Sequence, residues 1–115
     1  MSIEIENVIK ILTLVALIDD HFSDEEELVI AKICHNYNLP IKKFDEIYLE
    51  LQNHSENKFE LCERLVDQIK NTELKKDLIK NLSTLISSDH IIHENELLIY
   101  KLIAQKWNMF REEKN

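Results

Sequence analysis

The sequence predicts an all-α protein: a single-domain antiparallel array of about six helices with an internal helix-turn-helix duplication. The first observation is that there are no glycines and one proline, so the tight turns with positive φ that β-hairpins use would be hard to build. The second is that apolar residues recur at helical spacing along the whole chain. The third is a composition of 44% hydrophobic and 31% charged residues, which suits one folded domain over residues 1–115.

The first helix is expected to be central and buried on most sides. Its apolar residues fill one broad face and leave few polar positions between them. They are Ile5, Val8, Ile9, Leu12, Val15 and Ala16, with Ile11, Leu14 and Ile18 widening the stripe.

The second helix is expected to begin at a capping box. The Ser23 hydroxyl can accept from the amide three residues later, while the Glu26 side chain reaches back to the Ser23 amide. The acidic first turn that results also interacts favourably with the positive end of the helix dipole. Pro40 disfavours helical backbone at Leu39 and opens the next helix, so the second helix should end near Asn38.

Four more helices follow from the same periodicity. A third carries Ile41, Phe44, Ile47, Tyr48 and Leu51, with a break at residues 53–55. A fourth carries Phe59, Cys62, Leu65, Val66 and Ile69. A fifth, with Thr72 as its expected N-cap, carries Leu74, Leu78, Ile79, Leu82, Leu85 and Ile86. The last begins at His93-Glu94-Asn95-Glu96, a weaker cap, and should run to about Arg111.

The chain also matches itself when shifted by 70 residues. Ile9, Lys10, Leu12, Asp19, Glu26, Leu28, Ile33 and Asn38 recur as Ile79, Lys80, Leu82, Asp89, Glu96, Leu98, Ile103 and Asn108. Conservative replacements, such as Tyr37 with Trp107, keep core and polar positions in register. The halves at about 8–39 and 78–109 are therefore predicted to be two copies of one unit, and the two aromatic residues are expected to close helix ends in the core.

The formal net charge of −8 lies in the first half of the chain. Residues 1–57 carry 12 acidic and 4 basic side chains, whereas residues 58–115 carry 10 of each. An acidic surface repels phosphate, and no basic stripe interleaved with aromatic residues is visible, so nucleic-acid binding is not expected. Cations or basic protein surfaces are the expected partners.

Neither a secretion signal nor a membrane segment is evident. The first six residues lack basic side chains, and no apolar run approaches about 18 residues. A cytoplasmic protein without membrane insertion is the expectation. Cys34 and Cys62 are too few and too far apart for a disulfide framework or a zinc site, and are expected to be buried reduced thiols.

Two acidic turns carry a resemblance to a known family. Residues 19–26 read Asp-Asp-His-Phe-Ser-Asp-Glu-Glu, and residues 89–96 read Asp-His-Ile-Ile-His-Glu-Asn-Glu. Both resemble the turn of the TerB-like tellurite-resistance family, in which a helix ends in Asp-Gly and a Glu opens the next helix. The likeness extends roughly from Val8 to Phe110. One departure is that Asp20 and His90 replace the family's glycine, although Asp and His tolerate left-handed backbone better than most residues.

This resemblance implies a non-enzymatic, acidic helical protein of bacterial stress and tellurite-resistance systems that binds a divalent cation at its acidic turns. Carboxylate oxygens suit hard cations such as calcium or magnesium, and no Lys or Arg occurs between Lys10 and Lys32 to neutralise them. The candidate ligands are Asp19, Asp20, Asp24 and Glu26 in the first turn and Asp89 and Glu96 in the second. His90 and His93 are weaker candidates for a transition metal.

Other interpretations remain open. Glu26 and Glu96 can be capping residues, with Asp19 and Asp89 bonding exposed helix amides. In that case the turns are structural, and the acidic face docks a basic protein partner. A homodimer is a further alternative. No nucleophile with a base and no glycine-rich phosphate loop is present in the sequence, so an enzyme is not expected.

Overall fold

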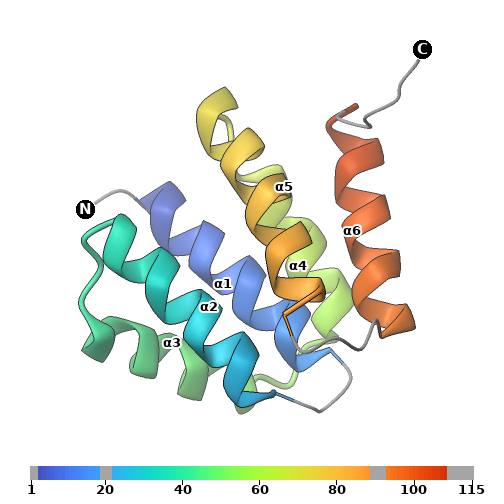
Figure 1. Cartoon of the computed structure of the whole chain (residues 1–115). Helices are drawn as coiled ribbons and strands as arrows, with labels where there is room; N and C mark the ends of the chain where they lie inside the picture. Colours follow the sequence, from blue (N-terminus) through green and yellow to red (C-terminus); the bar gives the residue numbers. More distant parts are fainter. Residues whose placement is uncertain (1–2, 19–21, 89–92, 109–115) are drawn as a thin grey trace.

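The computed structural model describes residues 3–18, 22–88 and 93–108, which form six helices and no strands (Figure 1). The helices are α1 (Ile3–Leu17), α2 (Asp24–Asn36), α3 (Ile41–Gln52), α4 (Lys58–Asp67), α5 (Thr72–Ile86) and α6 (Glu94–Lys106). The radius of gyration of 13.3 Å is that of one folded domain of this size. The predicted all-α class is confirmed.

The first helix is central, as predicted. α1 contacts each of the other five helices, and seven of its apolar side chains are fully inaccessible to solvent. They are Val8, Ile9, Ile11, Leu12, Leu14, Val15 and Ala16. The one buried hydroxyl among them, that of Thr13, donates to the Ile9 carbonyl at 2.8 Å and so keeps a partner inside the core.

The boundaries of α2 follow the predicted signals. It begins at Asp24 after the N-cap Ser23, and the reciprocal bonds of the capping box are both present. It ends at Asn36, two residues before the predicted end, because Asn38 has a left-handed backbone with φ 60°. Pro40 is the N-cap of α3.

Two predicted boundaries are wrong. Thr72 is the first residue of α5 rather than its N-cap. Asn71 is the cap, and its Oδ1 accepts from the Leu74 amide at 3.0 Å. Asn is at least as good an N-cap as Thr, so the stronger of two adjacent candidates takes the position. The last helix ends at Lys106 instead of about Arg111, because Asn108 is left-handed with φ 55°.

Several features of the two predicted repeat halves correspond in the structure. α2 and α6 have 13 residues each, with bounds 70 residues apart. Each is followed by a left-handed asparagine. α1 and α5 are in contact, and α2 and α6 both begin at the lower end of the molecule in Figure 1. These correspondences are what a duplication would leave, and the duplication itself stays a prediction.

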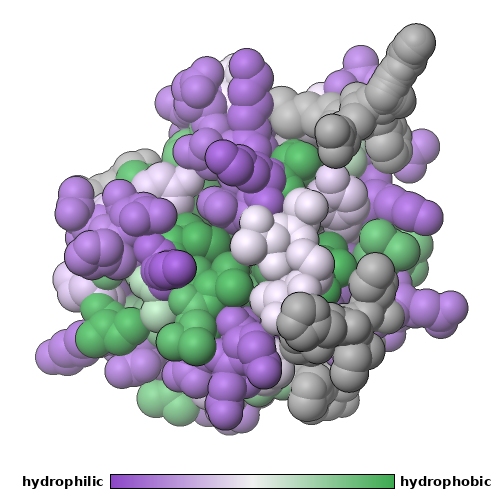
Figure 2. Space-filling model, viewed as in Figure 1, coloured by the Kyte–Doolittle hydropathy of each residue, from purple (hydrophilic) through white to green (hydrophobic). Residues whose placement is uncertain are grey.

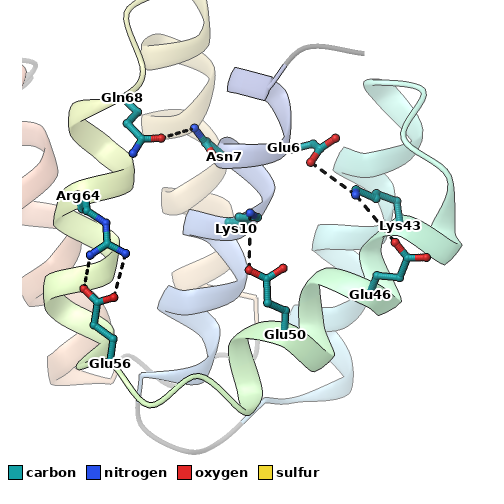
Figure 3. A network of polar contacts seen from close by, with 9 residues as sticks. All are labelled: Glu6, Asn7, Lys10, Lys43, Glu46, Glu50, Glu56, Arg64 and Gln68. Atoms are coloured by element: carbon teal, nitrogen blue, oxygen red, sulfur yellow. Dashed lines mark hydrogen bonds and ion pairs between the residues drawn. The ribbon is translucent and has the colours of Figure 1, made fainter.

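Polar contacts tie α1 to its neighbours and involve many of the acidic residues (Figure 3). Lys10 pairs with Glu50 of α3 at 3.8 Å, and Lys43 of α3 pairs with Glu6 of α1 at 3.7 Å. Asn7 donates to Gln68, which follows α4, at 3.1 Å. These contacts join residues far apart in the sequence and give Glu6 and Glu50 a lysine partner.

Candidate functional site

The structure describes half of the predicted metal-site residues. Asp24, Glu26, His93 and Glu96 are described, whereas Asp19, Asp20, Asp89 and His90 lie outside the described residues. The candidate site is therefore built from the first turns of α2 and α6.

Glu26 serves the start of its own helix. Its Oε1 accepts from the Ser23 amide at 2.9 Å and from the Ser23 hydroxyl at 3.2 Å, while the Ser23 Oγ accepts from the Glu26 amide at 3.1 Å. The residue is 1% exposed. A buried carboxylate held in a capping box has its charge compensated by helix amides, so this arrangement favours the structural interpretation of Glu26.

Glu96 occupies the same position in α6 and is also 1% exposed. His93 stands where Ser23 stands in α2, and it makes no side-chain cap bond. α2 and α6 are not packed against each other, so Glu26 and Glu96 are held by helices that are not direct neighbours. In residues 3–18, 22–88 and 93–108, no three His, Cys, Asp or Glu side chains are grouped so as to hold a metal ion.

Exposed negative charge gathers at the first turn of α2. Asp24, Glu25 and Glu27 are exposed, and none of them has an ion-pair partner within the part of the chain that the structure describes. By contrast, four other acidic residues of the first half are paired with lysine or arginine: Glu6, Glu46, Glu50 and Glu56. We refer to Asp24, Glu25 and Glu27 as the acidic start of α2.

The geometry of this turn suits an extended partner better than a single ion. Successive helix residues are rotated by about 100°, so the three carboxylates do not converge on one point. Residues three and four apart share a face, which places Asp24, Glu27 and Leu28 together. Leu28 is 69% exposed, and Figure 2 shows an apolar area over α2 with hydrophilic residues around it.

The exposure of Leu28 can be predicted from the apolar periodicity of α2. The buried positions of α2 are Glu26, Ile30, Ile33 and Cys34, and Leu28 lies off that stripe. Leu28 and Leu98, which match across the repeat, are both exposed, at 69% and 48%. A helical wheel of α2 alone would have placed Leu28 on the surface.

The two aromatic residues that match across the repeat both lie at helix ends and pack against the core, as predicted. Tyr37 follows α2, and its hydroxyl donates to Asp77 Oδ2 of α5 at 3.2 Å. Burial, together with the Asp77 charge and this hydrogen bond, raises the pKa of Tyr37 to about 12. Trp107 follows α6 and has the Lys75 Nζ 5.5 Å from its ring centroid, a cation–π contact that ties α6 to α5.

Both cysteines are buried free thiols, as predicted. Burial raises the pKa of Cys34 to about 11 and, with a smaller effect of the Glu63 charge, that of Cys62 to about 12. Because the thiolate is the reactive form, both cysteines are weak nucleophiles at neutral pH.

No family model, curated protein or solved structure gives a significant match to this chain. Among the described helices, none has the length and apolar character needed to cross a membrane. The functional assignment therefore depends on the residues and their geometry.

Proposed function

We propose that this protein is a non-enzymatic helical binding module of the cytoplasm that docks a basic protein partner through the acidic start of α2. One observation carries the proposal. Asp24, Glu25 and Glu27 are exposed without an ion-pair partner among the described residues, whereas Glu6, Glu46, Glu50 and Glu56 are paired. Unneutralised charge on one patch attracts an oppositely charged surface and orients it.

The exposed leucine defines the kind of partner. Leu28 shares a face with Asp24 and Glu27 and is 69% exposed, so a partner gains by covering it as well as by pairing with the carboxylates. An amphipathic helix with lysine or arginine beside an apolar stripe meets both requirements, since it presents positive charge and apolar side chains on adjacent faces.

A calorimetric titration tests this proposal. The probe is a synthetic amphipathic helix of lysine and leucine, titrated at physiological salt. Because exposed ion pairs contribute about 0.2–1 kcal/mol each, the variant Asp24→Asn/Glu25→Gln/Glu27→Gln should bind about tenfold more weakly.

The matched control removes the same charge elsewhere. Glu60, Glu63 and Glu73 are exposed acidic residues of α4 and α5, and Glu60→Gln/Glu63→Gln/Glu73→Gln should bind nearly as well as the parent protein. Equal weakening in the two triple variants would mean that net charge alone is recognised, and the proposal would then be wrong.

A divalent cation at the first acidic turn is the second candidate function. Asp24 is exposed and without an ion-pair partner in the described part of the chain, and it closely follows Asp19 and Asp20 in a stretch without Lys or Arg. The resemblance to the TerB-like family supports this candidate and implies a place in bacterial stress or tellurite resistance. Calcium or magnesium would be the cation of such an all-oxygen site.

This candidate has its own titration. Calcium, magnesium, manganese and zinc are each added to the parent protein and to Asp19→Ala/Asp89→Ala. Binding heat for one of these ions in the parent that is lost in the variant supports a cation site at the turns. An absence of heat with every ion, or equal heat in the two proteins, would contradict it.

A further inference from the structure

An apolar groove runs between α4 and α6. It has a volume of about 340 Å³, and its apolar lining is formed by Phe59, Cys62 and Val66 of α4 with Ile99, Leu102 and Ile103 of α6. Leu98 and Leu102, one helical turn apart on α6, are 48% and 49% exposed. Figure 2 shows apolar residues among hydrophilic ones at the right of the view, where α6 lies. Contiguous exposed apolar surface of this kind is typical of an interaction site.

The face of α6 that carries Leu98 and Leu102 is exposed, at 48% and 49%. α6 packs on α1, α4 and α5 in the part of the chain that the structure describes, and these three helices leave that face open. One side of α6 is therefore available for another helix.

One stripe of α6 is complementary to itself. Glu94, Leu98, Leu102 and Lys106 follow one another at intervals of four residues, so they lie along one face of the helix. When two such helices run antiparallel about a twofold axis between the leucines, Leu98 faces Leu102 of the second copy and Glu94 faces its Lys106. Lys106 also pairs with Asp67 of its own chain at 3.0 Å, so in the dimer its ammonium group lies between two carboxylates. Each contact then occurs twice, as in an isologous interface.

Charge over the whole molecule favours the same face. The acidic excess lies in residues 1–57, with 12 acidic and 4 basic side chains, whereas residues 58–115 carry 10 of each. Two copies that meet through α2 or α3 would bring like charges together, which costs free energy. Two copies that meet through α4 and α6 bring together the halves without net charge.

We infer that the protein forms a twofold homodimer in which the α6 helices pair antiparallel through Glu94, Leu98, Leu102 and Lys106. The α4–α6 groove beside this stripe adds apolar area to the contact. The acidic start of α2 is not part of the interface, so this inference is independent of the proposed function.

Sedimentation velocity and light scattering on the full chain, from micromolar to millimolar concentrations, test the interface. A dimer is expected, and Leu102→Glu should weaken it about tenfold or more, because a charge is then buried against the second copy. Leu28→Glu and Leu49→Glu are the matched controls, since these leucines are 69% and 56% exposed on other helices. They should leave the dimer unchanged. A monomer at millimolar concentration, or equal weakening by a control, would overturn the inference.

A charge exchange tests the antiparallel register. Glu94→Lys should weaken the dimer several-fold, because it places a lysine opposite Lys106 of the second copy. Glu94→Lys combined with Lys106→Glu should recover part of the parent affinity, since the pair is re-formed with its signs exchanged while the pair of Lys106 with Asp67 is lost. Recovery cannot come from a purely structural effect on one chain. If the double variant dimerises no better than Glu94→Lys alone, the register is wrong.

Discussion

Two side chains at the start of α2 form the cap with which this helix begins. The Ser23 hydroxyl and the Glu26 carboxylate satisfy each other's backbone amides at 3.1 and 2.9 Å. This reciprocal arrangement was predictable because its partners are three residues apart in the sequence. The same spacing in α6 has His93 in place of the serine, and no such side-chain cap forms there.

Ser23→Ala should lower the free energy of unfolding by about 1 kcal/mol, because the Glu26 amide loses its acceptor. Urea denaturation followed by circular dichroism measures the change. Ser83→Ala is the control, since Ser83 is exposed within α5 and alanine is the better helix former there. A Ser23→Ala protein as stable as the parent would show that the cap contributes nothing.

The raised pKa of Tyr37 predicts that the stability of the protein decreases at alkaline pH. Burial and Asp77 raise its pKa from 10.0 to about 12, so between these values the folded chain binds more protons than the unfolded chain. The stabilising effect of the neutral phenol is therefore complete below pH 10 and is lost as the pH rises toward 12. Asp77→Asn should lower the pKa of Tyr37, which ultraviolet titration of the phenolate measures. An unchanged titration curve would exclude Asp77 as a cause.

The bond between Tyr37 and Asp77 was not predictable from the sequence. Its partners are 40 residues apart, and neither the hydrophobic period nor the repeat brings Asp77 to the end of α2. Pairs within one helix can be predicted from a sequence because the spacing of two residues along the helix determines their relative position. Pairs between helices depend on how the helices pack.

At the scale of elements, left-handed asparagines end the second helix of each half. Asn38 and Asn108 have φ of 60° and 55°, and asparagine tolerates this region better than most residues other than glycine. The chain has no glycine, so asparagine takes the role that glycine usually has at a helix end.

Asn38→Ala should destabilise the protein by about 1–2 kcal/mol, because alanine pays the full steric cost of left-handed backbone. Asn36→Ala is the control, since Asn36 is the exposed last residue of α2 and keeps helical backbone. Thermal unfolding compares the two. Equal stability of the two variants would mean that the backbone at residue 38 relaxes to another conformation.

Most helix starts and the buried stripes were predicted, whereas the start of α5 was misplaced by one residue and the end of α6 was placed too far along the chain. Pro40 follows Asn38 and gives an explicit stop signal for α2, but no proline or glycine follows Asn108. An asparagine that continues a helix and one that ends it look the same in a sequence. Shifting Asn38 by 70 residues was the only available indication, and it does identify Asn108.

At the scale of the whole molecule, ion pairs formed in the fold determine which acidic residues keep an unpaired charge. The sequence shows 12 acidic residues in its first half, but ion pairs of α3 with α1 and of Arg64 with Glu56 engage several of them. Among the described residues of the first half, the exposed acidic side chains without an ion pair are Asp24, Glu25 and Glu27 at the start of α2 and Asp45 of α3. Sequence reasoning found the acidic turn, but whether Glu26 and Glu96 converge depends on the packing of α2 and α6, which are not packed against each other.

Nuclear magnetic resonance provides the most direct test of the proposed binding surface. The isotope-labelled protein is titrated with the amphipathic lysine–leucine helix, and backbone amide shifts are followed residue by residue. The largest changes should cluster at Asp24, Glu25, Glu27 and Leu28, with small changes on α4 and α6. Changes centred on the α4–α6 groove, or spread evenly over the surface, would contradict the account.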